Sequence, residues 1–262
     1  MRYELNNQSR FVCSCPCFQS NFKSFHKLTN RTHRKLQVLL IIMPSYTLTY
    51  YPMGGRAAIS RLAFVIGGVK FEDERLNGEQ LDEIIKKHPE RFPKETVPAL
   101  TIFDDEGKVQ HVINQSTAIG AFASRVSGLW PEDAQLASIC DEITAENFDM
   151  WDGAKGGSTT FSLEGEEQKV ARQKWQEETV KPIFARMNTL AAGAEKSGFA
   201  LGTDKPTYAD LVIFTTVATF ASGFLDHVDK DLAVAFPNLL KVSGSVGALP
   251  AVQEFLAAHP TM

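Results

Sequence analysis

The sequence predicts an α/β domain of the order β-α-β-α-β-β-α, followed by a domain made only of helices. Strand and helix patterns alternate between residues 45 and 126, and a turn at 104–107 joins two strands as a hairpin. After Leu129-Trp130-Pro131 the strand patterns stop and helical periodicity remains. Because the hairpin follows an α/β unit, we expect a mixed sheet with one antiparallel edge.

Each element of the first domain has a local signal. The opening strand, at 45–51, is rich in aromatic and β-branched residues and ends at Pro52. The next segment places apolar residues at helical spacing and stops at a pair of glycines. The other strands are expected at 69–76, 97–103 and 108–113, and the helices at 56–66, 78–87 and 116–126.

The second domain is expected to hold five helical segments, separated by breaks rich in glycine and proline. Thr207-Tyr208-Ala209-Asp210 is typical of a capping box, in which the threonine hydroxyl takes the N3 amide and the aspartate takes the cap amide. The segments are 132–154, 164–194, 207–222, 237–246 and 252–258.

Composition and charge narrow the class of function. The chain has 262 residues, of which 44% are hydrophobic and 22% charged, which is ordinary for a globular protein with two domains. Seven of its 27 Lys and Arg residues lie in 1–42, against one of its 31 Asp and Glu residues. The remaining body is acidic. We therefore expect neither nucleic acid nor a membrane as partner, since neutralising phosphates takes clustered basic residues.

Residues 1–42 are expected to be an unstructured leader, because they are polar and lack a sustained period. The leader is similar to an organelle transit peptide, but we favour a misread gene start, with translation beginning at Met43. Its cysteines, Cys13, Cys15 and Cys17, match no zinc spacing. The body holds a single cysteine, Cys140, which favours a reducing compartment. The expected location is the cytoplasm, or an organelle if the leader is genuine.

Short motifs in the first domain outline one extended polar site that can hold a peptide-like thiol against a tyrosine hydroxyl. They precede the helix that begins near Thr117. In chain order they are Tyr50-Tyr51, Gly55-Arg56-Ala57, Glu72-Asp73, Val97-Pro98 and Gln115-Ser116.

In this order and spacing the motifs resemble the cytosolic glutathione S-transferases of the sigma type, the group that includes glutathione-dependent prostaglandin D synthases. Tyr208-Ala209-Asp210-Leu211 also matches the cap-box helix of that family. The resemblance covers residues 43–262. It implies a thioredoxin-like, glutathione-binding domain at 43–127, an all-helical domain at 130–262 that forms the electrophile site, and a homodimer.

The resemblance implies a detoxifying transferase that conjugates the glutathione thiolate to small hydrophobic electrophiles, with no metal. One alternative is a glutathione-dependent isomerase, in which the thiolate is returned. Another is a non-catalytic ligand-binding or structural relative, against which the retention of Tyr50 and Arg56 speaks. A redox enzyme needs a reactive cysteine after the first strand, where this chain has Pro52-Met53-Gly54-Gly55.

Tyr50 is the catalytic candidate. A thiol has a reference pKa of about 8.5, and a hydroxyl that donates to sulfur favours the thiolate and lowers that pKa. Tyr46 lies on the same strand face but nearer the strand start, and Tyr51 points to the opposite side. Arg56 is expected to hold the Tyr50 hydroxyl and to add positive potential, or else to form a surface ion pair.

The remaining candidates bind the peptide. The resemblance implies a cis bond between Val97 and Pro98 that presents the Val97 backbone for strand-like pairing. Gln115 and Ser116 open a helix and are expected to hold the charged amino-terminal end of glutathione.

The opposite, glycine end of glutathione is expected near Leu81 and Thr96, where the family often has a tryptophan and a glutamine or lysine. Lys86 is a candidate for the missing charge. Trp151 and Phe161 are candidates for the electrophile pocket, with core packing as the alternative.

Overall fold

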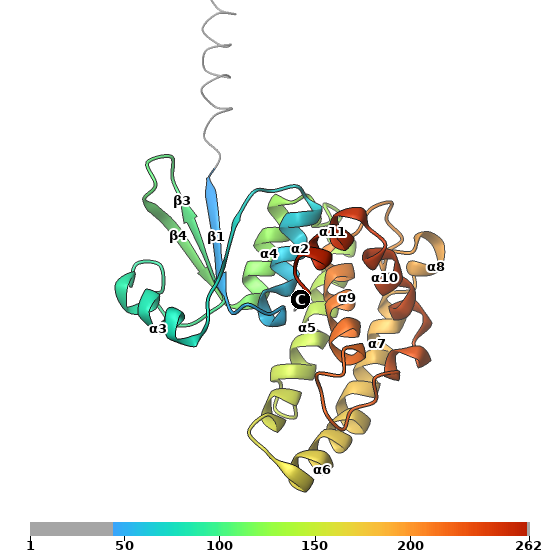
Figure 1. Cartoon of the computed structure of the whole chain (residues 1–262). Helices are drawn as coiled ribbons and strands as arrows, with labels where there is room; N and C mark the ends of the chain where they lie inside the picture. Colours follow the sequence, from blue (N-terminus) through green and yellow to red (C-terminus); the bar gives the residue numbers. More distant parts are fainter. Residues whose placement is uncertain (1–43, 261–262) are drawn as a thin grey trace, which may run out of the picture. The chain divides into compact units, whose positions relative to one another are not determined.

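The computed structural model describes residues 44–260, so the expected leader at 1–42 lies outside the described residues. From Ser45 onward the chain forms one compact unit, with an α/β domain followed by an all-helical domain (Figure 1). None of the helices between residues 44 and 260 is long and apolar enough to cross a membrane.

Four strands form one mixed sheet in the order β2-β1-β3-β4. β1 pairs in parallel with β2 and antiparallel with β3, and β3 pairs antiparallel with β4, which confirms the expected sheet. Thr49 lies opposite Ala99, so the carboxyl end of β1 adjoins the start of β3. The strands are β1 (Ser45–Tyr50), β2 (Glu72–Arg75), β3 (Ala99–Phe103) and β4 (Val109–Asn114).

Three α-helices accompany the sheet. Helices α2 (Ala58–Ile66) and α4 (Ser116–Val126) pack against each other on the side of the sheet that faces the second domain, and α3 (Gly78–Lys87) lies on the other side (Figure 1). A short 3-10 helix, η2 (Gly55–Ala57), leads from β1 into α2. The apolar core of the domain lies between the sheet and the α2–α4 pair, where Leu48, Phe64 and Ile119 are fully buried.

The second domain is built from helices around a core of large apolar side chains. The Phe220 ring contacts the rings of Trp175 and Phe184 in this core, and the Trp175 indole N–H donates to the Met150 carbonyl at 3.0 Å. The helices are α5 (Ala134–Asp152), η3 (Gly157–Thr160), α6 (Gly165–Trp175), the π-helical η4 (Gln176–Val180), α7 (Lys181–Leu190), α8 (Ala194–Ser197), α9 (Tyr208–Ala221), η5 (Leu232–Ala235), α10 (Pro237–Gly247) and α11 (Pro250–Ala258).

The start of α9 joins the two domains. The buried Tyr208 donates from its hydroxyl to the Thr117 carbonyl of α4 at 3.3 Å, and burial raises its pKa to about 12. Gly120 favours this close approach, because a Cβ on it would lie 3.0 Å from that hydroxyl. The expected capping box is confirmed: Asp210 accepts the Thr207 amide at 2.6 Å. Two helices of different domains are thereby fixed side by side.

The element types were predicted better than their bounds. The expected strand at 69–76 shortens to β2, and the expected helix at 164–194 divides into α6, η4 and α7. The segments before and after η4 both keep the apolar spacing of a helix. Periodicity alone therefore does not reveal the wider π turn between them. The short α8 was not foreseen, since four residues carry too little pattern.

Candidate active site

Tyr50 ends β1, directly behind the η2 turn. Its hydroxyl oxygen accepts the backbone N–H of Arg56 at 3.3 Å. The described residues offer no acceptor to the hydroxyl's own proton, so that proton is available to a ligand atom. Gly55 makes this approach possible, because its φ is +43° and a Cβ on it would lie 2.9 Å from the hydroxyl oxygen.

The competing tyrosines lie in different surroundings. The Tyr46 ring stacks on Phe64 at 5.6 Å and meets Phe122 edge-on at 5.9 Å, between the sheet and the two helices that cover it. Burial raises the pKa of Tyr46. Tyr51 follows β1, is 39% exposed, and meets the Tyr50 ring edge-on. Of these three tyrosines in the described part of the chain, only Tyr50 has a hydroxyl that accepts a backbone N–H from the turn after β1.

Arg56 contacts Tyr50 by its backbone amide and not by its guanidinium, which forms the surface ion pair that was the alternative expectation. The guanidinium instead forms a bidentate ion pair with Asp152 at the end of α5, at 2.7 and 2.9 Å. Hydrogen bonding to Asp152 raises the pKa of Arg56. The pair links the first domain to the second, and it offsets part of the positive potential that Arg56 was expected to supply.

Arg61 on α2 was not foreseen, although it supports the same turn. Its side chain is fully buried, and it donates to the Met53 and Tyr51 carbonyls and to Asp73 at 2.8 Å. Its guanidinium carbon lies 5.9 Å from the centre of the Tyr50 ring. Burial lowers the pKa of Arg61 and Asp73 opposes that shift. The available signal was a charged residue within the apolar run of a helix.

The peptide bond between Val97 and Pro98 is cis, as the resemblance implies. Pro98 is buried and Val97 is half-buried, directly before β3. Because β3 pairs with β1, this segment adjoins the strand that ends in Tyr50. The pairing of the Val97 backbone with glutathione stays a prediction.

Gln115 and Ser116 open helix α4. Gln115 has a φ of +74°, which is uncommon for a residue other than glycine, and such strained residues cluster at active sites and ligand-binding segments. Its exposed side chain does not cap the helix. The first amides of α4 thus have no side-chain acceptor among the described residues, and a helix start with open amides favours an anion.

The three residues expected near the glycine end of glutathione do not line the cavity described below. Leu81 is 2% exposed, so its side chain packs in the interior and is not presented to a ligand. Lys86 and Thr96 are exposed. Their contact with the peptide stays a prediction.

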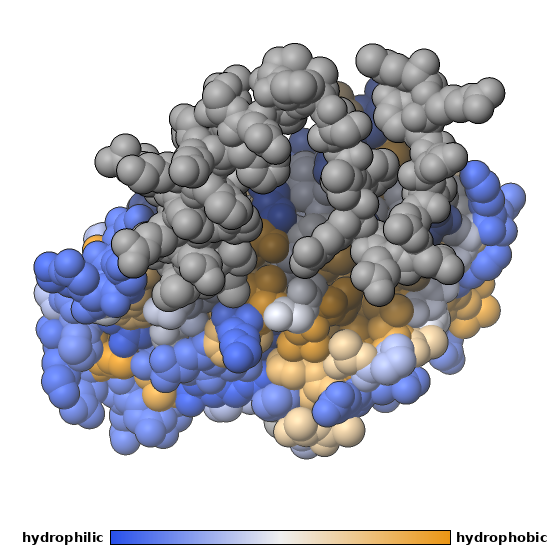
Figure 2. Space-filling view, turned by 90° about the horizontal axis from the view of Figure 1, so that it is seen from above, coloured by the Kyte–Doolittle hydropathy of each residue, from blue (hydrophilic) through white to orange (hydrophobic). Residues whose placement is uncertain are grey.

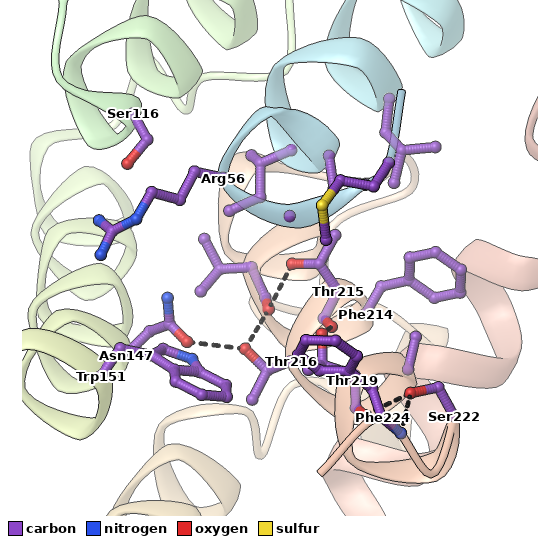
Figure 3. A pocket seen from close by; sticks show the side chains of 18 of the residues that line it. Arg56, Ser116, Asn147, Trp151, Phe214, Thr215, Thr216, Thr219, Ser222 and Phe224 are labelled. Carbon is purple, nitrogen blue, oxygen red and sulfur yellow. Dashed lines mark hydrogen bonds between the residues drawn. The ribbon is translucent and has the colours of Figure 1, made fainter. Parts of the chain in front are cut away.

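A cavity of about 780 Å³ lies between the η2–α2 region of the first domain and the helices of the second (Figure 3). Arg56 and Ser116 line it, and both lie on the same side of the close-up view. Trp151 and Phe161, the two candidates for an electrophile pocket, also line it. Tyr50 is buried and does not line this space, but its hydroxyl lies directly behind Gly55 and Arg56, which do.

Helices α5 and α9 supply most of the opposite wall. Three aromatic residues of this wall, Phe148, Phe161 and Phe224, are 46 to 58% exposed. Exposed hydrophobic residues also gather in one area of the described surface in Figure 2. Threonines interrupt the apolar wall at helical spacing. The lining residues on α5 and α9 are Thr144, Asn147, Phe148, Trp151, Asp152, Tyr208, Val212, Phe214, Thr215, Thr216, Ala218 and Thr219.

The fold and the cavity together define a two-domain enzyme class: a thioredoxin-like domain with a tyrosine at the end of its first strand, closed by an all-helical domain. The family model for the glutathione S-transferase C-terminal domain matches residues 154–259. Glutathione S-transferase 3 of Caenorhabditis elegans is 31% identical over 222 residues, which cover 83% of this chain and 98% of the relative. The chain belongs to the glutathione S-transferase family.

Two further comparisons agree with this membership. Hematopoietic prostaglandin D synthase of Gallus gallus is 28% identical over 83% of this chain and 98% of its own length. The solved structure of a sigma class GST from Fasciola hepatica has a TM-score of 0.69 at 22% identity, and covers 82% of this chain and 97% of that structure. The first comparison extends the sequence relationship and the second concerns the fold.

Proposed function

We propose that this enzyme conjugates the thiolate of glutathione to small hydrophobic electrophiles, and that Tyr50 stabilises the thiolate. One observation carries the proposal. The Tyr50 hydroxyl accepts the Arg56 amide, so its own proton is free to be donated to a sulfur atom beside the cavity. A hydrogen bond to a charged acceptor contributes about 1.5–3 kcal/mol, which lowers a thiol pKa by about one to two units.

The chain's other residues hold the peptide part of glutathione. The open amides of α4 and the Ser116 hydroxyl bind a carboxylate, and Gln115 binds the neighbouring amine or carboxylate. The Val97 backbone pairs with the peptide in strand fashion, before cis-Pro98. These contacts lie away from sulfur, so they bind the ground state and the transition state equally.

The electrophile occupies the cavity between the domains. Aromatic side chains on its helical wall bury apolar surface, and a volume of about 780 Å³ suits a small organic molecule. Isomerisation with the thiolate returned is the second candidate, because a prostaglandin D synthase is among the relatives of this chain. An endoperoxide separates the two reactions, since conjugation consumes glutathione and isomerisation does not.

The finer description follows the family. We place the boundary of the two domains at the linker between α4 and α5, near residues 127–130. We further propose that the enzyme acts as a homodimer, in the cytoplasm, in detoxification. Light scattering of the purified chain tests the dimer, for which we expect twice the chain mass of 29.0 kDa.

Activity with glutathione tests the proposal. The purified chain should bind glutathione in a calorimeter and conjugate it to a panel of aryl halides and enones. Tyr50→Phe should bind glutathione nearly as well and turn over slowly at neutral pH. A chain that binds no glutathione and conjugates none of the panel contradicts the proposal.

A further inference from the structure

Most threonine hydroxyls on the helical wall of the cavity already donate their protons to other groups of the wall. Three of its threonines donate to carbonyl oxygens one turn earlier in their helices, at 2.7 to 2.9 Å. The bonds run from Thr144 to Cys140 at 2.7 Å, from Thr215 to Leu211 at 2.9 Å and from Thr219 to Thr215 at 2.8 Å. These hydroxyls therefore present mainly lone pairs to the cavity.

Asn147 differs from these threonines. Its Oδ1 lies 2.8 Å from the Thr216 hydroxyl oxygen, across the gap between α5 and α9. The Thr216 hydroxyl also lies 2.7 Å from the Val212 carbonyl, and we assign its single proton to Asn147, whose Oδ1 has no other donor among the described residues. That bond fixes the carboxamide with its oxygen toward α9. The Asn147 N–H donors then have no partner among the described residues.

The free amide nitrogen faces the reacting end of the cavity. In Figure 3 the Asn147 nitrogen is turned away from Thr216, toward the side where Arg56 and Ser116 lie. Asn147 is also half-buried and precedes Trp151 by one helical turn. An electrophile between this wall and a thiolate near Tyr50 would meet the amide donors with its polar group.

We infer that Asn147 determines specificity for electrophiles whose reactive double bond is conjugated to a carbonyl, an inference that rests on the proposed conjugation. When the thiolate sulfur bonds to the β-carbon, the carbon–carbon π pair shifts and negative charge develops on the carbonyl oxygen. The Asn147 N–H donors stabilise that charge. A proton from water then returns to the α-carbon, which completes the addition. A halide electrophile sends the electron pair to its leaving halide and has no such oxygen.

The test compares two substrates of similar size, 4-phenyl-3-buten-2-one and benzyl chloride, in the full chain. Asn147→Leu should lower kcat/KM for the enone about 10- to 100-fold more than for the chloride. Asn147→Asp keeps the side-chain shape and the bond from Thr216 but has no N–H donor, so it should lower the same ratio. It serves as the second variant if the leucine disturbs folding.

A control variant makes the same kind of change outside the cavity. Gln173→Leu replaces an exposed amide on α6 that does not line the cavity, and it should leave the enone-to-chloride ratio unchanged. A ratio that stays unchanged in both Asn147 variants, or that falls equally in Gln173→Leu, overturns the inference while conjugation itself stands. An unaltered chain that conjugates neither substrate refutes the proposed function, and this inference with it.

Discussion

The two sides of the cavity are built by different means. On the α/β side the candidate groups are set by short turns: the η2 turn brings a backbone amide to Tyr50, a cis bond precedes β3, and an unusual φ at Gln115 opens α4. On the helical side the lining groups are side chains on two regular helices, α5 and α9. Backbone geometry sets the side that we propose to bind the constant peptide of glutathione, and exchangeable side chains form the side that we propose to meet a variable electrophile.

The largest effect is expected from the buried support of the α/β side. Arg61→Met should destabilise the protein by about 3–5 kcal/mol, because the Met53 and Tyr51 carbonyls lose their charged donor and Asp73 retains only Arg75. Denaturant unfolding of the variant and the parent measures the difference. A loss under about 1 kcal/mol would show that the turn behind Tyr50 does not depend on this ion pair.

On the helical side the matching support is Asp210. Asp210→Ala should cost about 2–4 kcal/mol, because the buried amides of Ala200 and Thr207 lose their acceptor. Asp204→Ala, at an exposed position six residues earlier, is the control and should change stability by less than about 0.5 kcal/mol. Equal losses of stability in the two variants would show that the capping box does not stabilise the helical domain.

Ser116 tests whether the α/β side serves binding rather than chemistry. Ser116→Ala should raise the KM for glutathione by about fivefold, equivalent to about 1 kcal/mol, and leave kcat nearly unchanged. Steady-state kinetics at saturating electrophile give both constants. A variant with a normal KM and a reduced kcat contradicts the assignment.

The smallest effect on stability is expected where the two sides meet. The Arg56–Asp152 pair is half-exposed at Arg56, so a double-mutant cycle with Arg56→Met and Asp152→Asn should give a coupling of about 0.2–1 kcal/mol. Urea unfolding of the four proteins provides the cycle. A coupling well above this range would make the pair a structural clamp between the domains.

This contrast also explains how much the sequence could predict. Motifs such as Gly55-Arg56 and Val97-Pro98 are contiguous, so the order of strands and helices and the α/β side of the site were predicted from them. Asn147 and Thr216 are 69 positions apart, and nothing local marks them as neighbours. The partner of Arg56 could not be predicted for the same reason, because Asp152 is 96 positions away in the sequence. Pairings across domains depend on tertiary packing, which periodicity does not encode.

The central claim is that the Tyr50 hydroxyl donates to the thiolate. Ultraviolet absorbance of the thiolate, titrated in the glutathione complexes of the parent and of Tyr50→Phe, tests it most directly. The account predicts a thiol pKa about one to two units higher in the variant, with a loss of kcat at neutral pH that shrinks as the pH rises. Identical titration curves in the two proteins would show that another residue activates the thiol.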